Sequence, residues 1–148
     1  MSQESIAYQL KSQIGQVIER WTASVCEDSR IQSDGNLTKP ELVDHVPALI
    51  EEICELIEKH ETPGLRNSLQ ARANVYVRFH QGYTGRDLVR ELSLLRITLL
   101  DFLVEMTPEG AEAFSAKDCQ ESGRIINLYL DEEMRYAISV FCGSPRSS

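Results

Sequence analysis

The sequence predicts an all-α protein, a bundle of about five to six helices. Apolar residues recur at three- and four-residue intervals in several long segments, and clusters of Gly, Pro, Asn and Asp separate those segments. No stretch shows the sustained period-two alternation with hairpin signals that strands require. A chain of 148 residues can bury about two-thirds of its unfolded surface in one domain. We therefore expect a single helical domain over residues 1–142, followed by a linker or tail at 143–148.

The first segment has the pattern of one amphipathic helix of about six turns. Its apolar stripe comprises Ile6, Leu10, Ile14, Val17, Ile18, Trp21 and Val25. A turn cluster at Asp34–Asn36 should end it. A capping box at Thr38–Glu41 opens the second helix, and Pro47 predicts a kink or restart near Asp44 and His45, because proline lacks the helical donor.

The next two helices form a predicted hairpin. The third runs from about Leu65 to Gln81, and Gly82 can end it in the left-handed conformation that glycine adopts at little cost. Thr84 can cap the fourth helix, from Gly85 to about Met106. This fourth helix is apolar over more than half of its circumference, which predicts a central position with neighbours on two or more sides.

The last helix is predicted from Ala111 to Phe141, with a break near Ser122 and Gly123. It carries more apolar residues than one stripe needs, so we expect it to pack on the core and on a second copy of the chain. The fourth or first helix could share in this homodimer contact. The predicted dimerisation residues are Leu128, Tyr129, Met134, Ile138 and Phe141.

Composition excludes several partners. The chain is 42% apolar and 26% charged, with a net charge of −8 and a pI near 4.9. This acidity argues against nucleic acid and anionic membranes. No apolar run approaches the ~18 residues of a spanning helix, so no membrane insertion is expected. The four cysteines are widely spaced without a C-x-x-C pair, and the first residues lack the layout of a secretory signal. These features predict reduced thiols and a cytoplasmic location.

Arg96 is the first candidate binding residue. On a helical wheel, six polar residues of the fourth helix share one arc, and Arg96 lies opposite them, between Leu92, Leu99 and Leu103. The polar arc consists of Asp87, Arg90, Glu91, Thr98, Asp101 and Glu105. A cation on an apolar face needs a partner, which could be a carboxylate of the same chain, a neighbouring subunit or a ligand anion.

His80 is the second candidate, because it shares an apolar stripe with Tyr76 and precedes the Gly82 turn, with Tyr83 next to it. One interpretation is a core histidine near a helix C-terminus. The other is a ligand site, in which His80 is the axial ligand of a haem and Arg96 receives a propionate. No second His or Cys stands at ligand spacing, so a metal site is not expected.

No catalytic arrangement is visible, and the chain is not expected to be an enzyme. It has no G-x-S-x-G, no H-E-x-x-H and no phosphate-cradling glycine loop. The acidic side of the second helix is predicted to face solvent. It is formed by Glu51, Glu52, Glu55 and Glu58. A histidine phosphotransfer protein is a further hypothesis. It is disfavoured because no histidine stands on a polar helix face, and His60 ends a helix rather than opening one.

One segment carries a family resemblance. The run R-A-N-V-Y-V-R-F-H-Q-G-Y from Arg72, followed by D-L-V-R-E-L-S-L-L-R up to Arg96, is marked by His80, by Gly82 with Tyr83, and by the E-x-x-x-L-R helix that begins at Glu91. It resembles the N-terminal sensory domain of RsbRD-type stressosome co-antagonists and of a class of bacterial sensor histidine kinases. A looser similarity extends from about Trp21 to Phe141.

The resemblance implies a function. It implies a non-catalytic signal-input and dimerisation domain without a cofactor, placed before a kinase or regulatory domain, and by analogy a globin-like fold without haem. The transmitter and regulatory domains of those proteins are not found in this sequence. We therefore expect a homodimer that passes changes in helix packing to a downstream partner domain.

Overall fold

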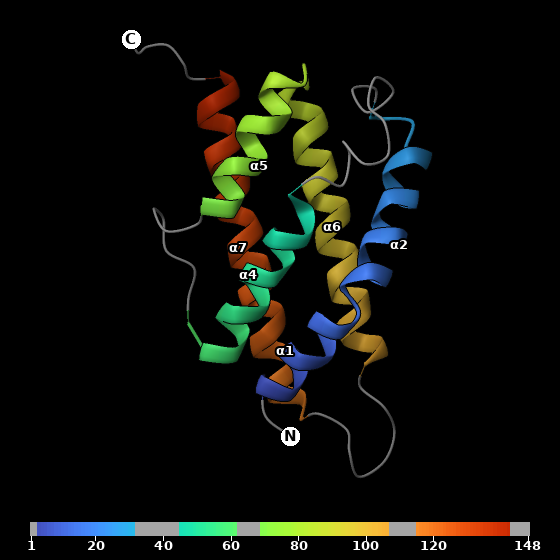
Figure 1. Cartoon of the computed structure of the whole chain (residues 1–148), viewed down its shortest axis with the longest axis vertical. Helices are drawn as coiled ribbons and strands as arrows, with labels where there is room; N and C mark the ends of the chain where they lie inside the picture. The colour runs from blue at the N-terminus through green and yellow to red at the C-terminus, as the bar shows by residue number, and fades with distance from the viewer. Residues whose placement is uncertain (1–2, 32–44, 62–68, 107–114, 143–148) are drawn as a thin grey trace.

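The computed structural model describes residues 3–31, 45–61, 69–106 and 115–142, and within them every regular element is a helix (Figure 1). The all-α prediction is confirmed. The six helices are α1 (Gln3–Ser12), α2 (Ile14–Glu27), α4 (Val46–Lys59), α5 (Leu69–His80), α6 (Gly85–Glu105) and α7 (Ala116–Cys142). None of these helices is both long enough and apolar enough to cross a membrane.

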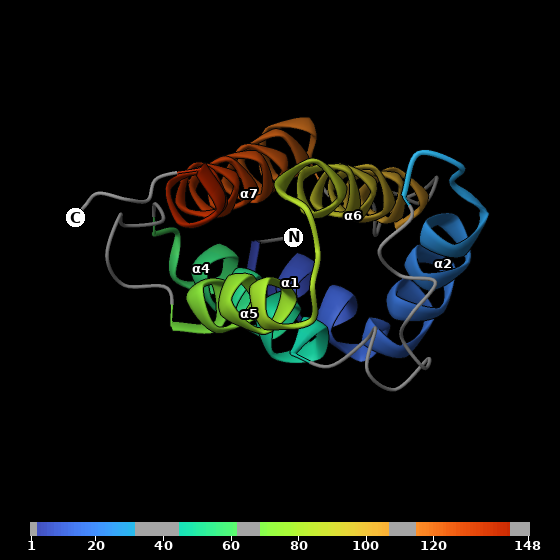
Figure 2. The same ribbon diagram turned by 90° about the horizontal axis from the view of Figure 1, so that it is seen from above.

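The helices form two layers around one core. Figure 2 shows α6 and α7 side by side in one layer, with α1, α2, α4 and α5 across from them. Large side chains from all of these helices meet between the layers, among them Trp21, Ile53, Leu99 and Tyr129. The expected central position of α6 is confirmed, because it packs on α7 within its layer and on α2 and α1 across the core.

The predicted first helix is interrupted. Gln13 leaves the helical conformation (φ −113°, ψ 16°), so α1 and α2 are separate elements. The turn is closed by the Gln13 N–H, which donates to the Leu10 carbonyl at 3.0 Å. The break lets α1 lie along α4 while α2 lies along α6. The continuous amphipathic pattern predicted the correct buried face. It could not reveal the break at Gln13, because the apolar spacing is the same with or without one non-helical residue.

The start of α4 follows from Pro47. The helix begins at Val46, so the proline stands in the first turn, where no backbone donor is needed. His45 precedes it in the left-handed conformation, with φ of 75°. The expected restart near His45 agrees with this start, whereas the capping box at Thr38–Glu41 lies outside the described residues.

The turn between α5 and α6 was predicted correctly. Gly82 has φ of +86°, and the Tyr83 N–H donates to the Arg78 carbonyl at 3.0 Å, as in a Schellman cap. Thr84 then accepts a hydrogen bond from the Asp87 N–H at 3.1 Å and caps α6. The chain thereby reverses direction between α5 and α6, which lie in opposite layers (Figure 2).

Helix α7 continues without the break predicted near Ser122 and Gly123, and that prediction is wrong. Both residues are buried inside the helix. A Cβ at Gly123 would lie 3.5 Å from Leu100 and 3.8 Å from Leu103, so the glycine lies at the α6–α7 contact. These are ordinary van der Waals distances, so an alanine would also fit at this contact. The start predicted for this helix, at Ala111, lies outside the described residues.

Candidate functional site

The ligand residues predicted from sequence do not come together. His80 and Tyr76 are exposed at the end of α5, where their rings stack with centroids 6.5 Å apart. Tyr83 is buried, and Arg96 is partly exposed on α6. The haem hypothesis assumed that His80 and Arg96 face a common apolar interior, and the exposed position of His80 removes that premise.

Arg96 has a partner in its own chain. Its Nη2 lies 2.7 Å from Asp131 Oδ1, which joins α6 to α7. The side chains of Arg96 and Asp131 are 27% and 52% exposed, so the pair is partly solvated. Pairs of this kind contribute about 0–1 kcal/mol. Arg96 is therefore partly buried, with its Nε enclosed, and the carboxylate of the same chain is the partner among the three alternatives.

The predicted polar arc of α6 is in part its buried face. Asp87, Glu91 and Thr98 are buried, whereas Ile97 and Val104 are exposed. The helical wheel placed these residues correctly relative to one another. The predicted apolar side is buried, and Asp101 and Glu105 of the polar arc are exposed as expected. The wheel assigned Glu91 to solvent because it could not show that a cation from another helix faces this residue.

That cation is Arg78 of α5, which is fully buried. Its Nε donates to Glu91 Oε1 at 3.1 Å, and Nη1 donates to Gln81 Oε1 at 2.9 Å. The Tyr83 hydroxyl donates to the other oxygen of Glu91. Trp21 adds a hydrogen bond from its indole to the Glu91 backbone carbonyl at 3.1 Å. This group links α2, α5 and α6 through a desolvated ion pair.

Sequence reasoning missed Arg78 and Glu91 as a pair, although both lie in the segment that carries the family resemblance. The sequence feature that could have indicated this pair is the position of Arg78 four residues before the Gly82 turn and of Glu91 about two turns into the next helix. An antiparallel hairpin brings such positions together. The signal became informative only once the hairpin geometry was known.

Two further polar contacts join α7 to its neighbours. The Tyr129 hydroxyl donates to Glu52 of α4, and Asn74 Nδ2 of α5 donates to Glu133 Oε2 at 2.8 Å. Tyr129 is buried, so the structure removes it from the predicted dimerisation surface. Glu52 is likewise partly buried and is not part of a solvated acidic face. Glu51, Glu55 and Glu58 do lie on that exposed side.

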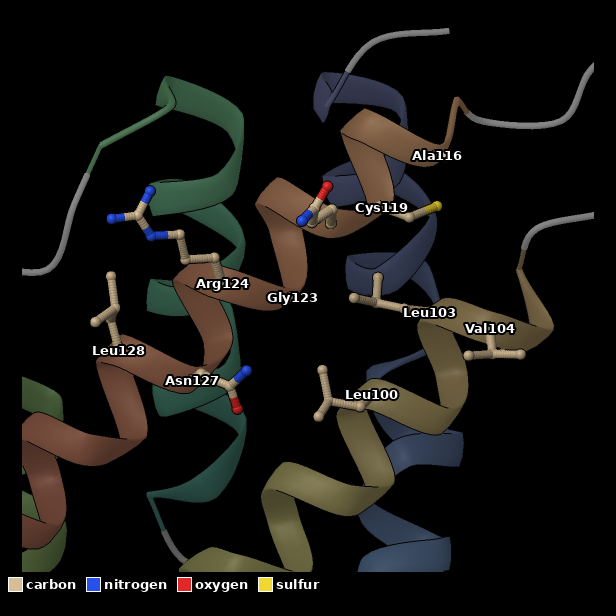
Figure 3. Close-up of a pocket in the computed structure, with 10 residues that line it drawn as sticks. Leu100, Leu103, Val104, Ala116, Cys119, Gly123, Arg124, Asn127 and Leu128 are labelled. Carbon is tan, nitrogen blue, oxygen red and sulfur yellow. The ribbon is translucent and has the colours of Figure 1, made fainter.

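The surface of α6 and α7 that faces away from the other layer is apolar and grooved. We call it the α6–α7 outer face, defined by Ile97, Leu100, Val104, Leu128 and Ile138. A groove of about 770 Å³ runs between the two helices, with Leu100 and Val104 on one side and Leu128 and Arg124 on the other (Figure 3). Ile97, Val104 and Ile138 are 49%, 74% and 56% exposed. Met134 and Phe141, also predicted at the dimer contact, are partly buried against the core.

None of Cys26, Cys54, Cys119 and Cys142 forms a disulfide in the described part of the chain. Burial raises the pKa of the Cys54 thiol to about 12. No cluster of three or more His, Cys, Asp or Glu side chains suited to a metal ion occurs in the described part of the chain.

Comparisons with known proteins add no family to the fold and surfaces described above. The chain matches no protein-family model, and neither a curated protein nor a solved structure shows significant similarity to it.

Proposed function

We propose that this chain is a cytoplasmic, non-catalytic signal-input and dimerisation domain of a bacterial sensor histidine kinase or stress-response regulator. The observation that carries the proposal is the α6–α7 outer face. Large apolar side chains stay exposed along α6 at Ile97 and Val104, with Leu100 between them. Val104 and Leu100 also line the groove, and exposed apolar side chains beside a groove are typical of a protein interface.

The spacing of these residues supports a helical partner. Ile97, Leu100 and Val104 are separated by three and four residues, the seam spacing of helices that pack side by side. On α7, Leu128 lines the groove and Ile138 is exposed further along the helix. A second copy that presents the same face would form a helical bundle across the interface, as in symmetric dimers.

The interior of the bundle supports a signalling role for the same helices. One side of α7 contributes to the outer face, and the other side carries Tyr129 and Glu133, which bond to α4 and α5. A shift of α4 or α5 would therefore reach the dimer contact through α7. The proposed output is such a change in helix packing, received by a kinase or regulatory domain as the downstream partner.

Substituting Val104 by glutamate tests the interface. We expect the wild-type chain to sediment as a dimer that dissociates on dilution, and Val104→Glu to sediment as a monomer, because a buried carboxylate without a partner opposes association. Tyr8→Glu is the matched control, since Tyr8 is also 74% exposed but lies on α1 in the opposite layer.

Sedimentation over a dilution series gives the answer. A wild-type chain that is monomeric at every concentration would refute the dimerisation role. A Val104→Glu chain that dimerises as well as Tyr8→Glu would refute this face as the interface.

A further inference from the structure

Glu133 and Asn74 form a buried contact between α7 and α5. Both side chains are at most 2% exposed, and Asn74 Nδ2 donates to Glu133 Oε2 at 2.8 Å. The contact joins residues 59 positions apart in the sequence. It is separate from the outer face and from the Arg78–Glu91 pair.

Each side chain in this contact also has one oxygen without a hydrogen-bond partner. Glu133 Oε1 and Asn74 Oδ1 are buried and accept no hydrogen bond. An unpaired buried oxygen costs about 1–3 kcal/mol, and more when it carries charge. An ionised carboxylate and an amide oxygen are both acceptors, so neither can satisfy the other. A proton on Glu133 Oε1 supplies the missing donor, because the acid O–H can then donate to Asn74 Oδ1. The two side chains would then be joined by two hydrogen bonds, one in each direction.

The charged groups around Glu133 act in both directions. Arg78 of α5 favours the ionised carboxylate, whereas Glu52 of α4 and Glu91 of α6 disfavour it. Arg78 is already engaged by Glu91 and Gln81, and the Tyr129 hydroxyl is engaged by Glu52. Burial is the largest effect and raises the pKa of the Glu133 carboxyl from 4.5 to about 8, against the lowering effect of the Asn74 hydrogen bond.

We infer that Glu133 and Asn74 form a proton-binding site that holds α5 on α7 when Glu133 is neutral and loosens this contact when Glu133 is charged. The ligand is a single proton. This inference goes beyond the proposed function, and it stands whether or not the chain dimerises. If the chain does receive a signal, a rise in pH would change the packing of α7 by removing the Glu133 proton.

The dependence of stability on pH follows from these two states. The unfolded chain loses the Glu133 proton near pH 4.5, and the folded chain retains it to about pH 8. Between those values the folded state binds one more proton than the unfolded state. The stabilisation is therefore complete below pH 4.5, falls as the pH rises through this window, and is lost above pH 8.

Replacing Glu133 by glutamine tests the inference. Glutamine mimics the neutral acid, and its amide N–H can donate to Asn74 Oδ1 at all pH values. We expect the urea midpoint of Glu133→Gln to be unchanged between pH 6 and pH 9, and higher than the wild-type midpoint at pH 9. Glu132→Gln is the matched control on the adjacent, partly exposed residue, and its midpoint should fall with pH like that of the wild type.

Direct titration of the Glu133 side-chain carbon by NMR completes the test in the full wild-type chain. A midpoint well above those of exposed glutamates such as Glu55 supports the site, and a midpoint among them overturns it, even if Glu133→Gln fails to fold. A wild-type urea midpoint that does not decline between pH 6 and pH 8 also overturns it. Sedimentation of Val104→Glu tests the dimer contact, whereas the urea midpoints and the NMR titration test the proton site. A failure of one proposal can therefore be told from a failure of the other.

Discussion

Replacing Arg78 by methionine is expected to lower the free energy of unfolding by about 3–5 kcal/mol. Methionine fills a similar volume but leaves the Glu91 carboxylate buried with its cation removed. The Tyr83 hydroxyl still donates to one oxygen of Glu91, but it brings no positive charge. The expected effect is large because Arg78 and Glu91 are both almost completely buried, and their charges cannot be solvated in place.

Arg90→Met is the matched control, measured by urea unfolding at pH 7. Arg90 lies on α6, one residue before Glu91, and its Nε lies 2.8 Å from Asp28 Oδ2. The Arg90 side chain is 29% exposed, whereas Arg78 is fully enclosed, so this variant should lose clearly less than Arg78→Met. Adding Glu91→Gln to Arg78→Met should recover part of the loss, because the unpaired charge is then gone. Equal losses for Arg78→Met and Arg90→Met would show that the buried pair does not hold α5 to α6.

Replacing Leu99 by alanine is expected to cost about 2–5 kcal/mol, through lost burial and the cavity left behind. Leu99 is fully buried on α6 between the two layers. Leu94→Ala, on the partly exposed part of the same helix, should cost clearly less. The single tryptophan, Trp21 on the adjacent α2, reports unfolding by fluorescence. If the Leu94 variant is the less stable of the two, the assigned buried face of α6 is incorrect.

The local features of this fold could be predicted from the sequence because their causes are local. Gly82 and Thr84 lie within four residues of the backbone groups that they serve, so turn chemistry alone identified the α5–α6 connection. The apolar periods of α2 and α4 likewise identified their buried sides. The break at Gln13 was missed because the apolar residues on both sides of it keep helical spacing.

The buried polar contacts could not be predicted in the same way, because their causes are distant in the sequence. Glu91 is stable inside the bundle only because Arg78 and Tyr83 meet it there, and Glu133 meets Asn74 from another helix. A charged residue on a helical wheel is assigned to solvent unless its partner is known. The wheel placed Arg96 on the apolar side of α6 but could not identify its partner, because Asp131 lies on a helix far along the chain.

The central claim is that two copies associate through the α6–α7 outer face, and site-specific photo-cross-linking tests it most directly. A photoreactive phenylalanine analogue at Val104 should give a covalent dimer on illumination, and the same analogue at Tyr8 should give none. The two positions are both 74% exposed, so access to solvent does not distinguish them. Peptide mapping should place the cross-link on α6 or α7 of the second copy. Equal dimer yields at both positions, or none at Val104, would contradict the account.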